Sequence, residues 1–208
     1  MTGRFLSLEG GEGAGKSTQL KALAAALRQR GIEVIETREP GGSSGAEAIR
    51  ELLLSGDADR WGPRAEALLF AAARADHVEK TIRPALARGA WVLTDRFLDS
   101  SRAYQAGASG LDDADILALH AFGSQGLLPD RTLVLTLPEG EAASRAATRD
   151  GGAGDRIGGR NAAFHARVAE AFSGYARQET ERFRLIEASG EPVAVTNRLL
   201  AAIADLLP

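Results

Sequence analysis

The sequence predicts an α/β fold in which a five-stranded parallel sheet is flanked by helices on both faces. Short apolar runs typical of strands alternate along the chain with amphipathic segments typical of helices, and strands separated by helices pair in parallel. Residues 10–17 read G-G-E-G-A-G-K-S and match the pattern G-x-x-x-x-G-K-[ST] between an apolar run and a helical one. A chain of 208 residues is long enough to bury a sizeable core, so we expect one domain over residues 1–208.

Five strands are expected along the chain. Residues 4–8 alternate in polarity and lead into the glycine-rich motif, and residues 32–37 follow a helix that Gly31 ends. Residues 91–94 are a compact apolar run that stops at Asp95, which predicts a buried central strand. The two remaining strands are expected over residues 133–137 and 183–186.

Helices are expected between these strands, because apolar side chains recur there at helical spacing. In the first of them, Leu20, Leu23 and Leu27 share one face. Pro84 marks a joint after the third, since proline cannot continue a helix without a kink. The expected helices are residues 17–30, 44–54, 64–78, a segment capped by Asp112 or Asp113, 138–148, 161–181, and the chain from Pro192.

Composition excludes several classes of protein. Cysteine is absent, which removes disulfides, thiolate catalysis and cysteine-based zinc sites. A formal net charge of -3 argues against non-specific binding to nucleic acid. The start lacks the features of a signal peptide, and no run of eighteen or more apolar residues occurs. We therefore expect a cytoplasmic protein with no membrane or nucleic-acid partner.

The motif at residues 10–17 predicts a bound nucleotide. Its glycines let consecutive backbone N–H groups turn toward phosphate oxygens, and the following helix points its N-terminus at the anion. Lys16 adds a charge at the β- and γ-phosphates, and Ser17 offers a hydroxyl to Mg²⁺. The residues assigned to this loop are Gly10, Gly11, Glu12, Gly13, Ala14, Gly15, Lys16, Ser17 and Thr18.

This loop alone is shared by GTPases, motor ATPases and small-molecule kinases. The sequence has no N-K-x-D motif to read guanine and no D-x-x-G motif after a strand. ATPases of large assemblies usually carry additional domains, for which this chain is too short. The remaining motifs therefore decide the class.

Five blocks, in order along nearly the whole chain, resemble those of the thymidylate kinase family, whose members transfer the γ-phosphoryl group of ATP to dTMP. They are E-G-G-E-G-A-G-K-S-T (9–18), T-R-E-P-G-G (37–42), L-F-A-A-A-R (69–74), D-R-F (95–97) and S-S-R-A-Y-Q (100–105). The resemblance implies the P-loop NTPase fold of nucleoside monophosphate kinases, with ATP and dTMP as substrates, Mg²⁺, and a homodimer. It also implies a mobile lid at the glycine-rich residues 149–160.

The resemblance assigns the acceptor site residue by residue. Phe70 would stack on thymine and Arg74 would donate toward its carbonyl edge, and positions four apart share one face of a helix. Cytosine presents a donor where thymine has O4, so it would leave a buried group unpaired. Arg38 and Arg96, at strand ends, would grip the dTMP phosphate, because guanidinium binds phosphate oxygens in a fork.

Further roles come from the same resemblance. Asp95 would hold Mg²⁺ together with Ser17, and Glu12 would reach the acceptor sugar. The remaining substrate contacts would come from Tyr104 beneath the deoxyribose and from Ser101 and Gln105 at the base. The expected catalytic residues are Lys16, Arg38, Asp95, Arg96 and the lid residues Arg149 and Arg156, with Arg160 as a further lid candidate.

Two alternatives stay open at the level of sequence. One is another deoxynucleotide or deoxynucleoside kinase of the same fold, and the other is a regulatory module that binds nucleotide without much chemistry. A complete acceptor pocket argues against the module. His77, His120 and His165 have no metal-like spacing and are expected to be structural.

Overall fold

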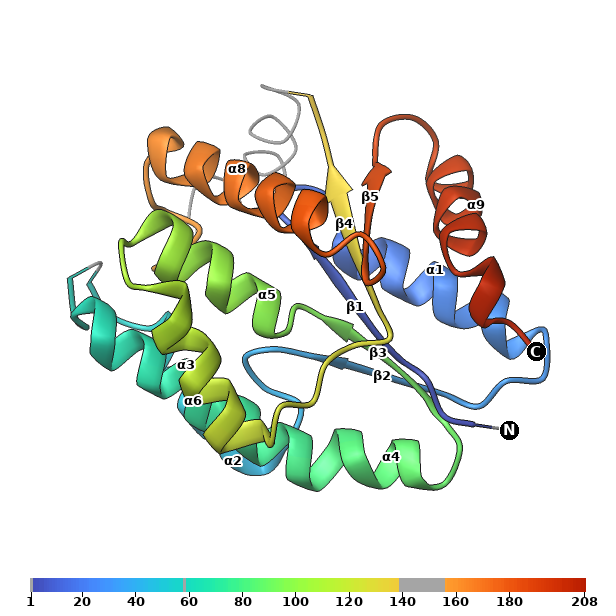
Figure 1. The fold of residues 1–208 in the computed structure, drawn as a ribbon, viewed down its shortest axis with the longest axis horizontal. Coiled ribbons are helices and arrows are strands. Elements are labelled where there is room, and N and C mark those ends of the chain that lie inside the picture. Colours follow the sequence, from blue (N-terminus) through green and yellow to red (C-terminus); the bar gives the residue numbers. More distant parts are fainter. Residues whose placement is uncertain (1, 58, 139–155) are drawn as a thin grey trace.

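The computed structural model describes residues 2–57, 59–138 and 156–208 (Figure 1). Five strands in these ranges form one parallel sheet in the order β2-β3-β1-β4-β5, which confirms the predicted fold class. The strands are β1 (Phe5–Gly10), β2 (Val34–Arg38), β3 (Trp91–Asp95), β4 (Arg131–Thr136) and β5 (Phe183–Glu187).

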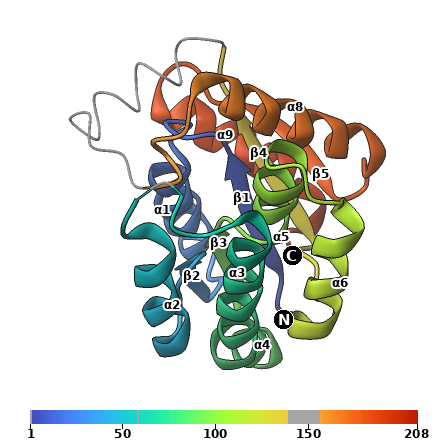
Figure 2. The ribbon, with the colours of Figure 1, turned by 90° about the vertical axis from the view of Figure 1, so that its left-hand side faces the viewer.

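Helices cover both faces of the sheet (Figures 1 and 2). Side chains of β1 alternate between the two faces, as strand geometry requires, so that Leu8 joins one core cluster and Phe5 another. The helical elements are α1 (Lys16–Arg28), α2 (Ser44–Leu54), α3 (Pro63–His77), η1 (Val78–Ile82), α4 (Arg83–Ala87), α5 (Leu98–Ser101), η2 (Arg102–Ala108), α6 (Asp113–Ser124), α8 (Ala162–Gln178), α9 (Pro192–Ala202) and η3 (Ala204–Leu206).

Three clusters of buried side chains hold the layers together. On one face, Leu23 and Leu27 of α1 pack with Leu199 of α9 against the sheet. On the other face, one cluster joins α3, η1, α4 and α6, and a second joins η2 to α8. Because helices cover both faces of the central strands, only the strand ends are open to ligands.

The joint expected at Pro84 is a π-helical turn. Segment η1 lies between α3 and α4, so the chain stays helical from Pro63 to Ala87. Proline lacks an N–H and its ring crowds the carbonyl four residues earlier, and a wider turn before it relieves that crowding.

Helix α5 and the π-helical segment η2 were not predicted. Their sequence shows little helical periodicity, because polar side chains such as Asp99, Arg102 and Gln105 are buried beside apolar ones. Helix α8 ends at Gln178 rather than 181, since Glu179 leaves the helical backbone region.

Some expectations fall on residues whose structure is not described. The helix expected over 138–148 and the part of the expected lid up to residue 155, including Arg149, lie outside the described residues. Within the described ranges, every helix is too short or too polar to cross a bilayer.

Candidate active site

Most of the predicted site residues meet where the parallel strands end. Strand pairing places Asp95 beside Leu8 of β1 and beside Arg38 of β2, so three carboxyl ends lie at one edge of the sheet. A cavity of about 480 Å³ opens there. The predicted residues that line it are Glu12, Gly13, Gly15, Lys16, Ser17, Thr18, Arg38, Phe70, Arg74, Asp95, Arg96, Ser101, Tyr104 and Gln105.

The phosphate loop joins β1 to α1. Gly10 has a φ of 128°, and a Cβ there would lie 2.4 Å from the Leu135 carbonyl oxygen, so only glycine fits beside β4. Gly15, with a φ of 82°, caps α1 in the left-handed region. The loop therefore leads directly into a helix N-terminus, where backbone N–H groups favour an anion.

Lys16 is buried and folded back over the loop. Its Nζ donates to the carbonyl oxygens of Gly10 at 3.2 Å and Gly11 at 2.8 Å. Burial, together with the charge of neighbouring Arg96, lowers the pKa of the ammonium group to about 8. A polyphosphate in the loop would supply the negative charge that favours the ammonium form.

Ser17 and Asp95, which were expected to hold Mg²⁺, lie in contact with each other. The Ser17 hydroxyl donates to Asp95 Oδ2 at 2.6 Å, which brings a hydroxyl and a carboxylate oxygen together at the phosphate loop. No group of three His, Cys, Asp or Glu side chains among the described residues could hold a metal. Mg²⁺ is usually held by one or two protein oxygens together with phosphates and waters, so this donor set fits it.

Arg96 lines the cavity between the phosphate loop and Tyr104. Its guanidinium donates to Gly10 O at 3.0 Å and to Glu12 Oε1 at 2.5 Å, and it lies over the Tyr104 ring at 5.0 Å. Arg38 is half-exposed and pairs with Glu47. Two guanidinium groups thus border the cavity beside the phosphate loop, which suits a second phosphate group.

A second pocket wall comes from α3. Phe70 and Arg74 both line the cavity, and their spacing of four places them on one face of α3. Arg74 is almost fully buried, and its Nε donates to Glu39 Oε2 at 2.8 Å while Nη2 donates to Ser101 Oγ at 2.7 Å. These contacts fix its orientation. Glu39 also lies 2.9 Å from His77 Nδ1, so a carboxylate within the T-R-E-P-G-G block supports the arginine.

Tyr104 and Gln105 come from η2. Burial raises the pKa of the Tyr104 hydroxyl, so it stays protonated at neutral pH. Gln105 Nε2 donates to Glu66 Oε1 at 2.9 Å, and both side chains are buried. Sequence reasoning missed Glu66, although its position one helical turn before Phe70 places it on the same face of α3.

Arg156 does not line the cavity. Its Nε donates to Leu53 O at 2.8 Å and its Nη2 to Glu66 Oε2 at 2.6 Å, and the side chain is buried. Arg160 also donates to that carboxylate, at 2.8 Å. The catalytic role expected for Arg156 stays a prediction, and in this structure its guanidinium joins the chain after residue 155 to α3.

The three histidines have partners inside the protein. His77 contacts Thr37 as well as Glu39, His120 Nε2 lies 2.8 Å from Leu127 O, and His165 Nε2 lies 3.2 Å from Gly158 O. These contacts agree with structural roles.

The cavity combines a glycine-rich phosphate loop, a carboxylate at the end of the neighbouring strand and two arginines beside them. This arrangement is that of a phosphate-loop kinase of the nucleoside monophosphate class. A sequence profile described as thymidylate kinase matches residues 8–199. The chain therefore belongs to the thymidylate kinase family, and it is a phosphotransferase.

Individual relatives agree with this assignment. The chain is 64% identical over its full length to the full length of a thymidylate kinase from Rhizorhabdus wittichii. It is 52% identical to one from Caulobacter vibrioides, over 99% of this chain and 96% of the relative. A crystal structure of thymidylate kinase from Ehrlichia chaffeensis superposes with a TM-score of 0.79 at 29% identity, covering 98% of this chain and 99% of that one.

Proposed function

We propose that the cavity transfers the γ-phosphoryl group of ATP in line to the 5′-phosphate of dTMP, giving dTDP for DNA precursor synthesis in the cytoplasm. The observation that carries this proposal is the position of Arg96. Its guanidinium touches the Gly10 carbonyl of the phosphate loop on one side and lies over Tyr104 of the acceptor pocket on the other. Donor and acceptor phosphates would therefore meet at one guanidinium. We also infer that residues 1–208 form a single catalytic domain.

The chain's own groups suffice to position both substrates. Lys16 and the loop N–H groups would hold the ATP phosphates, while Arg96 and Arg38 would hold the acceptor phosphate. An acceptor phosphate oxygen is already largely ionised at neutral pH, so the reaction needs no strong general base. Ser17 and Asp95 would hold Mg²⁺, which neutralises phosphate charge when bound.

The proposal is tested with an ADP-release assay on MgATP with dTMP, dUMP, dCMP, dGMP, UMP or thymidine as acceptor. We expect selective turnover of dTMP. Preference for another monophosphate would keep the fold and refute the thymine pocket. ATP binding without transfer to any acceptor would refute the proposed reaction and favour a regulatory module.

Arg74 is expected to set the choice of base. Replacing it with alanine removes a charged donor from a buried pocket, and such a hydrogen bond contributes about 1.5–3 kcal/mol. We therefore expect kcat/KM for dTMP to fall about 10- to 100-fold, with a smaller change for dCMP. The matched control is Arg64→Ala, an exposed arginine on the same helix. Equal losses for both nucleotides would contradict a base-reading role.

We further propose a homodimer through α3 and α6, which pack on each other. Phe122 on α6 is 91% exposed, and Leu68 on α3 is 56% exposed. Large exposed apolar side chains on neighbouring helices are typical of a protein interface.

Phe122→Asp is expected to convert the dimer to a monomer, because it would place a charge in an apolar contact. Light scattering after size exclusion measures the mass. Val193→Asp is the control, since Val193 is 71% exposed on α9 and should leave the dimer intact. A wild-type protein that is monomeric at micromolar concentration would refute the proposed interface.

A further inference from the structure

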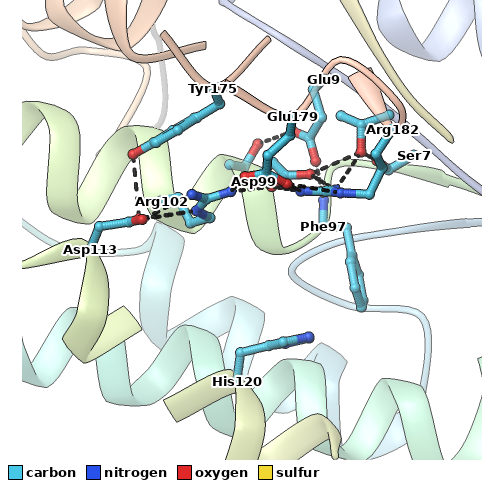
Figure 3. A network of polar contacts seen from close by, with 12 residues as sticks. Ser7, Glu9, Phe97, Asp99, Arg102, Asp113, His120, Tyr175, Glu179 and Arg182 are labelled. Atoms are coloured by element: carbon cyan, nitrogen blue, oxygen red, sulfur yellow. Dashed lines mark hydrogen bonds and ion pairs between the residues drawn. The ribbon is translucent and has the colours of Figure 1, made fainter. Parts of the chain in front are cut away.

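Glu9 carries a fully buried carboxyl group beside the phosphate loop. Its Oε1 accepts the backbone N–H of Phe97 at 2.8 Å, and its Oε2 lies 2.5 Å from Ser100 Oγ. Figure 3 shows Glu9 above Phe97 and next to Asp99. Among the described residues, no Lys, Arg or His side chain forms an ion pair with the Glu9 carboxyl group at a nitrogen–oxygen distance of 4.0 Å or less. A buried carboxyl group costs free energy, so its presence beside the phosphate loop calls for a function.

The contacts of Glu9 converge on Arg96. Arg96 has a φ of 70°, a left-handed conformation that is strained for a residue with a side chain. Such a conformation persists only when surrounding contacts determine it. The Arg96 N–H donates to Leu8 O at 3.0 Å, and its carbonyl accepts from Thr94 Oγ1 at 2.8 Å. Glu9 holds the next N–H along the chain, that of Phe97.

The Arg96 side chain is reached from the same carboxyl group. Ser100 Oγ, which touches Glu9, also accepts from Arg96 Nη1 at 3.1 Å. Glu9 thus has one contact to the backbone after Arg96 and one, through a serine hydroxyl, to its guanidinium. Neither contact requires Glu9 to reach the cavity, which it does not line.

We propose that Glu9 is a positioning residue for phosphoryl transfer, which fixes the turn at Arg96 through the Phe97 N–H and aims the Arg96 guanidinium through Ser100. This inference rests on the proposed role of Arg96 at the acceptor phosphate. It assigns Glu9 no contact with substrate, because its side chain has no exposed surface.

The positioning role does not require Glu9 to be charged. Burial, with the charge of Asp99 nearby, raises the pKa of Glu9 to about 8. The Phe97 N–H and the Ser100 hydroxyl both donate to Glu9, and a neutral carboxyl group still accepts from Phe97 through Oε1. Glutamine has the same shape and keeps that acceptor, and its amide N–H can donate to Ser100 Oγ. A general base, in contrast, needs a carboxylate, which glutamine cannot supply.

The experiment compares Glu9→Gln, Glu9→Ala and Ser100→Ala by kcat, by KM for dTMP and by KM for ATP. We expect Glu9→Gln to keep kcat within about threefold. Glu9→Ala and Ser100→Ala should each lower kcat/KM for dTMP about 10-fold or more, the effect of one buried hydrogen bond, while KM for ATP changes little. Ser7→Ala, a buried polar side chain on the same strand, is the control and should change only the melting temperature.

A double-mutant cycle separates positioning from a general structural effect. Ser100 also lines the cavity, so its loss could act on substrate directly. If it acts through Arg96, Ser100→Ala should cost less than about twofold once Arg96 is already alanine. An equal cost in both backgrounds would overturn the proposal. The cycle of Ser100→Ala with Arg96→Ala still tests the positioning of Arg96 if Glu9→Ala fails to fold.

Two further outcomes would overturn different parts of the proposal. A folded Glu9→Gln variant that loses about 100-fold in kcat would show that the carboxylate itself is needed, which overturns the positioning role. If Arg96→Ala leaves kcat/KM for dTMP unchanged, the proposed function of Arg96 fails first and the inference fails with it.

Discussion

Lys16→Ala is expected to lower kcat by about 1,000-fold and to leave the fold intact. In-line phosphoryl transfer depends on charge neutralisation at the transferring group, and removal of one preorganised donor typically costs about 2.7–4 kcal/mol of transition-state stabilisation. The Lys16 ammonium is the cation of the phosphate loop itself, and its two contacts are to loop carbonyl oxygens, so they contribute little to the core. Steady-state ADP release with saturating ATP and dTMP measures the loss.

The control for this prediction is Lys21→Ala, an exposed lysine of the same helix, which should retain activity. Circular dichroism should show unchanged helix content in both variants. Lys16→Met keeps most of the side-chain volume without the charge and should resemble the alanine variant. A Lys16→Ala rate within tenfold of wild type, in a folded protein, would contradict the assignment of the phosphate loop.

The sequence predicts well those parts of the fold for which the apolar pattern or the residue spacing alone decides the arrangement. The strand ending at Asp95 is a continuous apolar run, so its end is visible, and parallel pairing then places it beside Arg38. Phe70 and Arg74 share one face of the helix wherever the helix begins, because they are four residues apart. The substrate is inferred from the resemblance to the thymidylate kinase family, because residue spacing does not identify it.

Buried polar residues are where sequence reasoning fails. Glu9, Glu39 and Glu66 belong to a residue type that is rarely buried, yet each is buried against donors that are far away in sequence. Whether an acid is buried depends on which donors the fold brings to it. Helix α5 was missed for the same reason, since Asp99 interrupts its apolar pattern and finds its partners only in the folded protein.

Those partners predict the largest effect on stability. Asp99 is fully buried, accepts from Thr132 Oγ1 at 2.9 Å, and pairs with Arg182 at 2.5 Å and Arg102 at 3.3 Å. Figure 3 shows these arginines sharing Glu179 as well. Removing one partner of a buried ion pair costs about 3–5 kcal/mol, because the remaining charge stays buried without compensation.

Asp99→Ala is therefore expected to lower the free energy of unfolding by about 3 kcal/mol, measured by urea denaturation at neutral pH. The lower end of the range applies because Arg102 keeps Glu179 and Asp113, and Arg182 keeps Glu179. Glu33→Ala is the control, since its pair with Arg88 is surface-exposed and should contribute no more than about 1 kcal/mol. Equal losses in the two variants would mean that the network does not stabilise the protein.

The same variant tests whether this network supports the acceptor pocket. Asp99 ties α5 to β4 through Thr132 and to the start of β5 through Arg182. The chain continues from α5 into η2, which presents Tyr104 and Gln105 to the cavity. If the network fixes the position of η2, Asp99→Ala should raise KM for dTMP more than KM for ATP. The ATP site depends on the phosphate loop between β1 and α1 instead. Equal increases would indicate that Asp99 stabilises the protein without orienting the pocket.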